Sequence, residues 1–168
     1  HKFVFVHIPK CAGTSVRTQL IKCDSGHIGM GEVGSHSVLG NIDYGHVPLS
    51  LLRQYFPENY SYLERFTSYA VVRDPLDRFG SSLRQMLWRY DNRPMTLIPQ
   101  EELRDLTRKA IEDVAAELDR PSSKYIFFAR QRDFIYDEDR RIVDHLIPME
   151  LVPDFIAHIG RITGTAME

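Results

Sequence analysis

The order of strand, small-residue loop and helix in the first twenty residues constrains the fold most. Residues 3–7 are a short apolar run, typical of a buried strand, and a loop of small residues (9–13) follows. Thr14 and Ser15 are good helix-opening residues, and Val16 and Leu20 then recur at helical spacing. This order is the first half of a nucleotide-binding α/β unit, in which loop N–H groups and a helix N-terminus can hold a phosphate or sulfate.

Lys10 gives this loop a mobile positive charge, and the hydroxyls of Thr14 and Ser15 add hydrogen-bond donors. The pattern is not Walker A, because the lysine precedes Gly13 instead of following a glycine directly. The loop alone therefore leaves two interpretations open: an anion site, or an ordinary turn with an exposed lysine.

A second segment predicts another ligand-binding edge. Residues 68–72 are a candidate buried strand, and Arg73 follows at the C-terminal edge, where open α/β sheets bind ligands. Asp74 predicts an N-cap and Pro75 a first helical position. Ser81 comes eight residues after Arg73, about two helical turns on, so the two side chains can converge on one anion.

That second segment also has a simpler interpretation. Arg78 can form a surface ion pair with Asp74 or Asp77, with Ser81 merely solvated. The helix that starts here has an expected core stripe at helical spacing, made of Leu76, Phe79, Leu83, Leu87 and Tyr90.

The rest of the chain predicts one α/β domain over residues 1–168. Residues 24–41 are expected to be a loop with at most a short strand. Five further elements are expected: helices through 51–55, 101–118, 121–128 and 152–162, and a last core strand at 145–147.

Charge and cysteine content narrow the function classes. A net charge of −2 argues against nucleic acid as a partner, because polyanion binders usually carry a basic excess. Two cysteines make no disulfide framework and favour a reducing, cytoplasmic location; an anchor upstream would instead favour the Golgi lumen. No apolar run approaches the ~18 residues of a membrane span.

Two motifs together resemble the PAPS-dependent sulfotransferases (PAPS is 3′-phosphoadenosine-5′-phosphosulfate), most closely the carbohydrate-modifying, Golgi-type branch. Residues 8–15, Ile-Pro-Lys-Cys-Ala-Gly-Thr-Ser, resemble that branch's 5′-phosphosulfate loop. Arg73-Asp74-Pro75 with Arg78 and Ser81 resembles its 3′-phosphate segment, and residues 143–150 are more weakly similar to its late strand. The order and separation of the motifs also match the family. The resemblance implies a three-layer α/β sandwich around a central parallel sheet, with P-loop nucleotide-binding, sulfotransferase-like architecture.

The resemblance also implies roles for residues. The donor PAPS is expected to contact Lys10, which stabilises the charge on the leaving oxygen, and the rest of the loop: Cys11, Ala12, Gly13, Thr14 and Ser15. Arg73 and Ser81 are expected to bind the 3′-phosphate. No metal is expected, because these positive groups can neutralise the charge. The acceptor is expected to be a hydroxyl, on a carbohydrate by analogy with the branch; the oligomeric state stays open.

The general base is expected to be His46, which follows Gly45 on a tight turn in the interval where the resembled branch often carries a Gly-His pair. His36 is a rival base, and Glu32 is a carboxylate alternative. His7 is expected to be a packed strand-end residue. Tyr44 stands where some relatives have a second histidine.

Two other functions are compatible with the pattern. A P-loop kinase shares the strand–loop–helix logic but requires its lysine beside a Ser or Thr and an acidic magnesium ligand at a strand end, where Arg73 stands here. A non-catalytic module that binds PAPS or its product PAP, 3′,5′-adenosine bisphosphate, is the second alternative.

Overall fold

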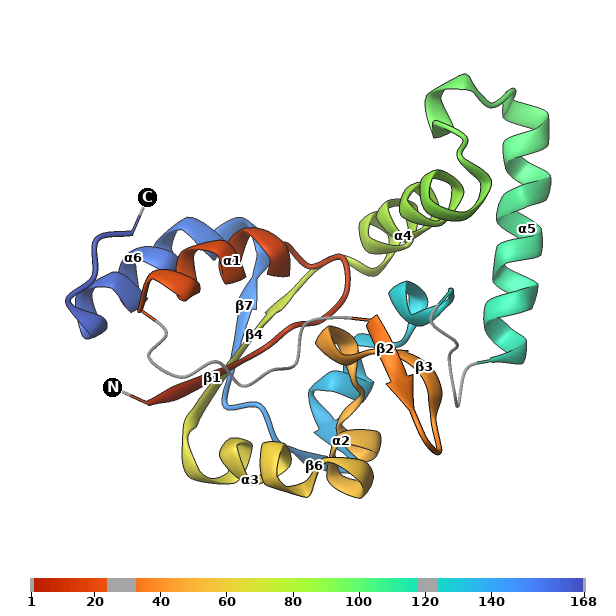
Figure 1. The fold of residues 1–168 in the computed structure, drawn as a ribbon. Coiled ribbons are helices and arrows are strands. Elements are labelled where there is room, and N and C mark those ends of the chain that lie inside the picture. Colours follow the sequence, from red (N-terminus) through yellow and green to blue (C-terminus); the bar gives the residue numbers. More distant parts are fainter. Residues whose placement is uncertain (1, 24–32, 118–123, 168) are drawn as a thin grey trace.

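The computed structural model describes residues 2–23, 33–117 and 124–167. A three-stranded parallel sheet lies at its centre, in the order β1-β4-β7 (Figure 1). Strand β1 spans Phe3–Val6, β4 spans Thr67–Val72 and β7 spans His145–Pro148. Phe3 pairs with Thr67, and Tyr69 pairs with His145. The three strands predicted from apolar runs are therefore confirmed, and because they are parallel their C-terminal ends share one edge.

Helices flank the sheet on both faces (Figure 1). Helices α1 (Gly13–Leu20) and α6 (Val152–Thr163) lie on one face, while α2 (Leu49–Tyr55) and α3 (Pro57–Arg65) lie on the other. The alternation of side chains along β1 explains this layering. Phe5 stacks on Phe155 of α6, whereas Val4 packs against the cluster of Leu49, Tyr60 and Leu63.

Helices α4 (Pro75–Asp91) and α5 (Gln100–Ala116) form an arm that projects from the sheet (Figure 1). Helix α4 begins as predicted: the Asp74 carboxylate accepts from the N–H groups of Leu76 and Asp77. The expected core stripe is partly wrong, because Leu76 is 83% exposed and Tyr90 41% exposed. Leu83 and Leu87 are buried as expected, and the other buried residues of α4 are Arg78, Ser82 and Met86.

A β-hairpin occupies part of the region expected to be a loop. Strands β2 (Val33–His36) and β3 (Gly40–Asp43) pair antiparallel. The imidazole Nδ1 of His36 accepts from the N–H groups of Val38 and Leu39 in the turn, each at 3.2 Å. Gly40 closes the turn in a left-handed conformation, with φ of 71°, so a glycine and side-chain capping together form it. Residues 24–32 lie outside the described residues.

Short elements complete the chain between the arm and the last helix. The predicted helix at 121–128 is seen only as the 3-10 helix Ile126–Phe128 (η4), since 118–123 lie outside the described residues. A second 3-10 helix, Gln131–Phe134 (η5), leads into the two-residue strands β5 (Tyr136–Asp137) and β6 (Arg140–Arg141). The 3-10 helix η6 (Met149–Leu151) precedes α6, and three more lie earlier in the chain: η1 (Ile21–Cys23), η2 (Tyr44–His46) and η3 (Met95–Leu97).

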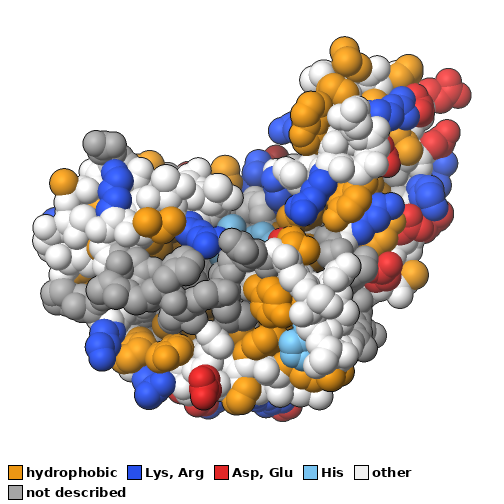
Figure 2. Space-filling model, viewed as in Figure 1, with side chains coloured by type: hydrophobic (Ala, Val, Ile, Leu, Met, Phe, Trp, Pro, Cys, Tyr) orange, Lys and Arg blue, Asp and Glu red, His pale blue; other side chains and the backbone are white. Residues whose placement is uncertain are grey.

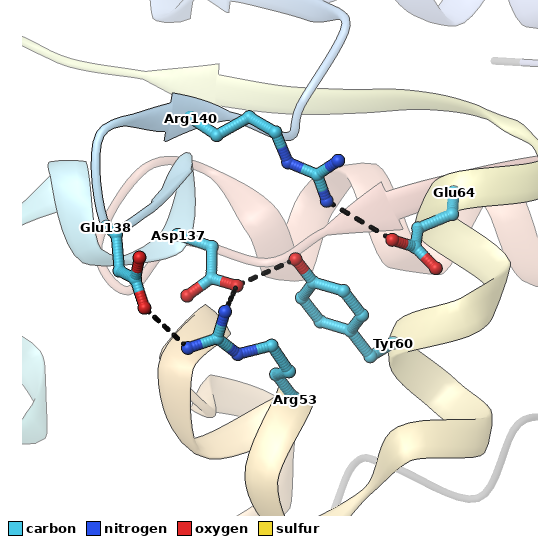
Figure 3. Close-up of polar contacts among 6 residues, drawn as sticks. All are labelled: Arg53, Tyr60, Glu64, Asp137, Glu138 and Arg140. Atoms are coloured by element: carbon cyan, nitrogen blue, oxygen red, sulfur yellow. Dashed lines mark hydrogen bonds and ion pairs between the residues drawn. The ribbon is translucent and has the colours of Figure 1, made fainter.

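A polar network ties β5–β6 to helices α2 and α3 (Figure 3). The buried Asp137 carboxylate accepts from Tyr60 at 2.8 Å and pairs with Arg53 at 3.0 Å. Arg53 also reaches Glu138, and Arg140 pairs with Glu64. Asp137 is 4% exposed, so its hydrogen-bonded oxygen joins three elements away from solvent.

Two further expectations from the sequence concern disulfide bonds and membrane-spanning helices. Cys11 and Cys23 are both free thiols, with Cys11 buried. In the described ranges, no helix is long and apolar enough to cross a membrane.

Candidate functional site

The loop between β1 and α1 has the backbone geometry of an anion cradle. Lys10 and Ala12 both adopt left-handed conformations, with φ of 64° and 56°. Cys11 between them is not left-handed, and alternation of left-handed with other conformations turns successive N–H groups toward one side of a loop. Ala12 is the N-cap of α1 and supplies no side-chain cap, whereas α4 is capped by Asp74. The first N–H groups of α1 therefore have no side-chain carboxylate competing for them.

Lys10 meets the second motif directly. Its Nζ donates to Oε1 of Gln85 on α4 at 3.3 Å, and Nη1 of Arg73 donates to the Lys10 carbonyl at 3.4 Å. Burial lowers the pKa of Lys10, and the charges of Arg73 and Arg84 lower it further. The two segments that resemble the donor-binding motifs, 63 residues apart, thus converge on one cationic site.

Ser81 lies on the same side of α4 as this lysine contact. It precedes Gln85 by one helical turn, and both side chains are half-buried at the flank of the buried stripe. Among the described residues, no side-chain hydrogen bond links Ser81 to Arg73. The structure therefore brings Ser81 toward the lysine loop through the shared face with Gln85, two turns from Arg73.

Gln131 holds Arg73 in place and was not foreseen from the sequence. Its side-chain amide pairs with the Arg73 backbone twice: Oε1 accepts from the Arg73 N–H at 3.0 Å, and Nε2 donates to the Arg73 carbonyl at 2.8 Å. The Cys11 thiol donates to the same Oε1 at 3.3 Å. One glutamine thus connects both motifs, and no local sequence pattern marks it, because its partners are 58 and 120 residues away.

Arg78 corrects the interpretation as a surface ion pair. It is 6% exposed, and its guanidinium donates to backbone carbonyls of Pro9, Phe127 and Ala129. Burial lowers its pKa. The neighbouring Ser82 hydroxyl also donates to the Phe127 carbonyl, at 2.7 Å. Arg78 therefore fixes the lysine loop against the 126–129 segment. Its hydrogen bonds go to backbone carbonyls and not to a ligand.

His46 is held by groups at the ends of two strands. It ends the short 3-10 helix Tyr44–His46, whose N-terminus is capped by Asp43 accepting from Gly45 N–H. Its Nδ1 lies 3.1 Å from the His7 carbonyl. A carbonyl oxygen can only accept, so Nδ1 carries the proton and Nε2 of the neutral ring keeps its lone pair. Burial lowers the pKa of His46, although the charge of Asp43 opposes this shift. The lowered pKa favours the neutral form of the ring near pH 7.

His7 lies between the lysine loop and His46. Its ring is 4.3 Å from the His46 ring, edge to face, and a Cβ on Gly13 would come within 1.8 Å of it. Burial lowers its pKa to about 3, helped by His46, Arg17 and Lys10. The expectation that His7 is a packed strand-end residue is confirmed, but what it packs against is the site itself.

A hollow separates the sheet-bearing body from the α4–α5 arm, with histidine side chains at its floor and lysine and arginine side chains around it (Figure 2). Beside His46, a small pocket is walled by β3, the start of α2 and Ile126. Its lining is apolar apart from Asn41, Asp43 and His46. In the described part of the chain, no group of three or more His, Cys, Asp or Glu side chains is placed to hold a metal ion.

The alternative bases are placed differently. His36 packs against Tyr55 and Phe56 and caps its own hairpin turn, so its contacts lie away from the lysine loop. Tyr44 packs on Phe56 and Gly34. Glu32 lies outside the described residues.

The comparisons with known proteins agree with the geometry. The model of the sulfotransferase family matches residues 1–152, which include both motifs, His46 and the three parallel strands. Searches of curated proteins and of solved structures find no significant match. Because the family model covers most of its length, this chain belongs to the sulfotransferase family, the family of carbohydrate, Golgi-type sulfotransferases.

Proposed function

We propose that the chain, as a single domain, transfers a sulfuryl group from PAPS to a hydroxyl of a carbohydrate acceptor. The observation that carries the proposal is the convergence of Lys10 and Arg73, from separate motifs, beside one parallel-sheet edge. Family membership supports transferase activity, and the family generally uses PAPS. The strand–loop–helix unit and its sheet edge are consistent with P-loop nucleotide-binding architecture.

In this proposal the donor binds across both motifs. The N–H groups of residues 12–15 and the Lys10 ammonium hold the 5′-phosphosulfate, with Cys11 filling space behind the loop. Arg73 and Ser81 hold the 3′-phosphate. Support comes from the start of α1, which has no side-chain cap, and from Lys10, whose pKa is lowered by burial and then by the nearby Arg73 and Arg84. An anion there would relieve the repulsion among these cations.

The chemical step is an in-line displacement at sulfur. The acceptor oxygen forms a bond to sulfur while the bond from sulfur to the phosphate oxygen breaks, and PAP departs with that electron pair. The acceptor proton passes to Nε2 of His46, whose lone pair is kept free because Nδ1–H is bonded to the His7 carbonyl. Lys10 stabilises the charge that develops on the leaving oxygen.

A transfer assay tests this function. Labelled PAPS is incubated with a panel of oligosaccharide acceptors, with wild-type protein and with His46→Asn, which keeps polarity but lacks an imidazole base. We expect wild-type transfer, a loss of kcat of about 100-fold or more in the variant, and unchanged PAP affinity. His36→Asn is the matched control and should keep full turnover.

Other outcomes would overturn the proposal. Stronger thermal stabilisation by ATP with magnesium than by PAP would favour a kinase. Stabilisation by PAP without transfer to any acceptor would favour a non-catalytic binding module. Full turnover by His46→Asn with loss in His36→Asn would move the base to the hairpin.

A further inference from the structure

The proposed function uses the backbone carbonyl of His7 but gives no role to its imidazole ring, although the ring touches both halves of the site. Its ring is half-buried between Gly13 of the donor loop and the ring of His46. Its backbone carbonyl is the partner of His46 Nδ1. One residue at the end of β1 thus contacts the donor loop through its side chain and the base through both ring and backbone.

The contact with Gly13 leaves no room for a side chain. A Cβ there would lie 1.8 Å from Cδ2 and 2.1 Å from Nε2 of His7, far inside van der Waals contact. Gly13 is itself the first residue of α1, so the imidazole rests directly on the helix start. Any displacement of the loop is therefore passed to the His7 ring by steric contact.

The His7 ring also touches His46. The ring centroids are 4.3 Å apart at an interplanar angle of 66°, an edge-to-face pair slightly closer than the roughly 4.5–7 Å typical of larger aromatic rings. The ring of Phe127 also contacts His46 edge to face, with centroids 6.1 Å apart. Two ring contacts and one hydrogen bond to the His7 carbonyl restrict rotation of the His46 side chain.

The charged groups around this pair are also defined. The charges that act on His7 are those of His46, Arg17 and Lys10, and those that act on His46 include Asp43, Lys10 and Arg78. Cations outnumber the one carboxylate, and both side chains are half-buried. Burial and this surrounding charge favour the neutral form of both rings.

We infer that His7 is a positioning residue for sulfuryl transfer, whose ring, wedged between Gly13 and His46, sets the position of the base relative to the donor loop. The inference rests on the proposed function, because it assigns His46 as the base. The role requires a flat aromatic ring between Gly13 and His46 and does not require proton transfer by His7 itself.

Two variants test the role of the ring in kinetics. His7→Ala removes the wedge and lets water reach His46. We expect kcat to fall by about 10-fold to 100-fold, the size of effect caused by small misplacements of a reacting group, with the PAP dissociation constant little changed. We also expect the acidic limb of the kcat profile to move to higher pH, because less burial raises the pKa of His46. His7→Phe keeps a flat ring and should restore both kcat and the wild-type profile.

A spectroscopic readout separates this inference from the proposed function. Nitrogen-15 chemical shifts of the His46 ring report its tautomer in the protein without substrate. We expect the Nδ1–H tautomer in wild type and in His7→Phe, and a mixture of tautomers in His7→Ala. His145→Ala, which removes a histidine stacked on Tyr69 instead, is the control and should leave His46 unchanged.

The outcomes divide cleanly. A wild-type protein that transfers no sulfate would contradict the proposed function, while the tautomer shifts still decide whether His7 positions His46. Wild-type kcat, pH profile and tautomer in His7→Ala would overturn the inference. A His7→Phe variant as impaired as His7→Ala would also overturn it, because the imidazole nitrogens would then be required.

Discussion

Single residues at this site bring positive charges close together, an arrangement that an anion would stabilise. Lys10 is partly buried beside Arg73 and Arg84, and all three effects lower its pKa. Gathering like charges costs free energy unless an opposite charge lies among them. By contrast, Arg78 donates its hydrogen bonds to backbone carbonyls, which stabilise its charge and fix the shape of the loop.

Gln131 provides a prediction at this scale. Gln131→Leu removes both hydrogen bonds to the Arg73 backbone and frees the Arg73 side chain to drift from Lys10. We expect PAP affinity to fall by about 10-fold and the free energy of unfolding to fall by about 1 kcal/mol, the cost of leaving two partly buried backbone groups without partners. Calorimetric titration and urea denaturation measure the two effects. Gln54→Leu, on the exposed side of α2, should change neither.

His7 predicts a pH dependence of stability. The folded protein keeps its imidazole neutral down to about pH 3, while an unfolded chain protonates histidine near 6.5. The unfolded state therefore takes up more protons between these values, and stability falls as pH falls through this window. Between pH 7 and pH 5 we expect a loss of about 2 kcal/mol from His7. Urea denaturation should show a smaller loss in His7→Phe; equal losses would contradict the burial of a neutral ring.

Sequence reasoning at this scale found the residues that belong to contiguous motifs and missed those defined by contact. Lys10 and Arg73 stand at recognisable places beside a predicted strand and helix, and Gly45-His46 fits a turn. Gln131 and the wedge formed by His7 depend on partners far along the chain, so no local spacing marks them. Arg78 was misjudged because its carbonyl partners are invisible in a charge pattern.

At the scale of elements, helix starts were the most predictable features. Asp74 and Pro75 supply a side-chain cap and a residue that needs no N–H donor, and α4 begins there. The hairpin β2–β3 and the two-residue strands β5 and β6 were not expected, because strands this short have too few residues to show a period. The core stripe of α4 failed at its ends, since Leu76 lies in the exposed first turn and Tyr90 on the projecting arm.

The cap of α4 predicts a stability difference. Asp74→Ala removes the acceptor for two N–H groups and should lower the free energy of unfolding by about 1 kcal/mol. Asp77→Ala removes only a charge from the first turn, so a smaller loss is expected. Urea denaturation of the two variants makes the comparison, and a larger loss in Asp77→Ala would contradict the assigned cap.

At the scale of the whole molecule, the parallel sheet explains how distant motifs meet. Strands β1 and β4 pair in parallel, so the residues that follow them emerge at one edge. This consequence could be predicted from two buried strands and their following loops. The sheet order, with β4 between β1 and β7, could not, because the sequence pattern carries no information on which strands are neighbours.

The polar network in Figure 3, which joins strands β5 and β6 to helices α2 and α3, predicts which carboxylate matters for stability. Asp137→Ala leaves the buried Tyr60 hydroxyl without its acceptor, and we expect the free energy of unfolding to fall by about 2 kcal/mol or more. Glu138→Gln, which touches only the exposed branch of the Arg53 contact, should leave stability unchanged. Thermal and urea unfolding provide the measurement. Equal losses in the two variants would show that the buried carboxylate has no special role.

The central claim is that the lysine loop and the Arg73 segment hold opposite ends of one 3′,5′-bisphosphorylated adenosine. The direct test is calorimetric titration of wild type and Arg73→Ala with PAP and with adenosine 5′-monophosphate, which lacks the 3′-phosphate, at one ionic strength. Arg104→Ala, an exposed arginine of α5, is the control. We predict that wild type and the control bind PAP about 10-fold to 100-fold more tightly than the monophosphate, and that Arg73→Ala loses most of this preference without weakening the monophosphate. Equal affinity of wild type for the two nucleotides, or an equal loss for both in Arg73→Ala, would contradict the account.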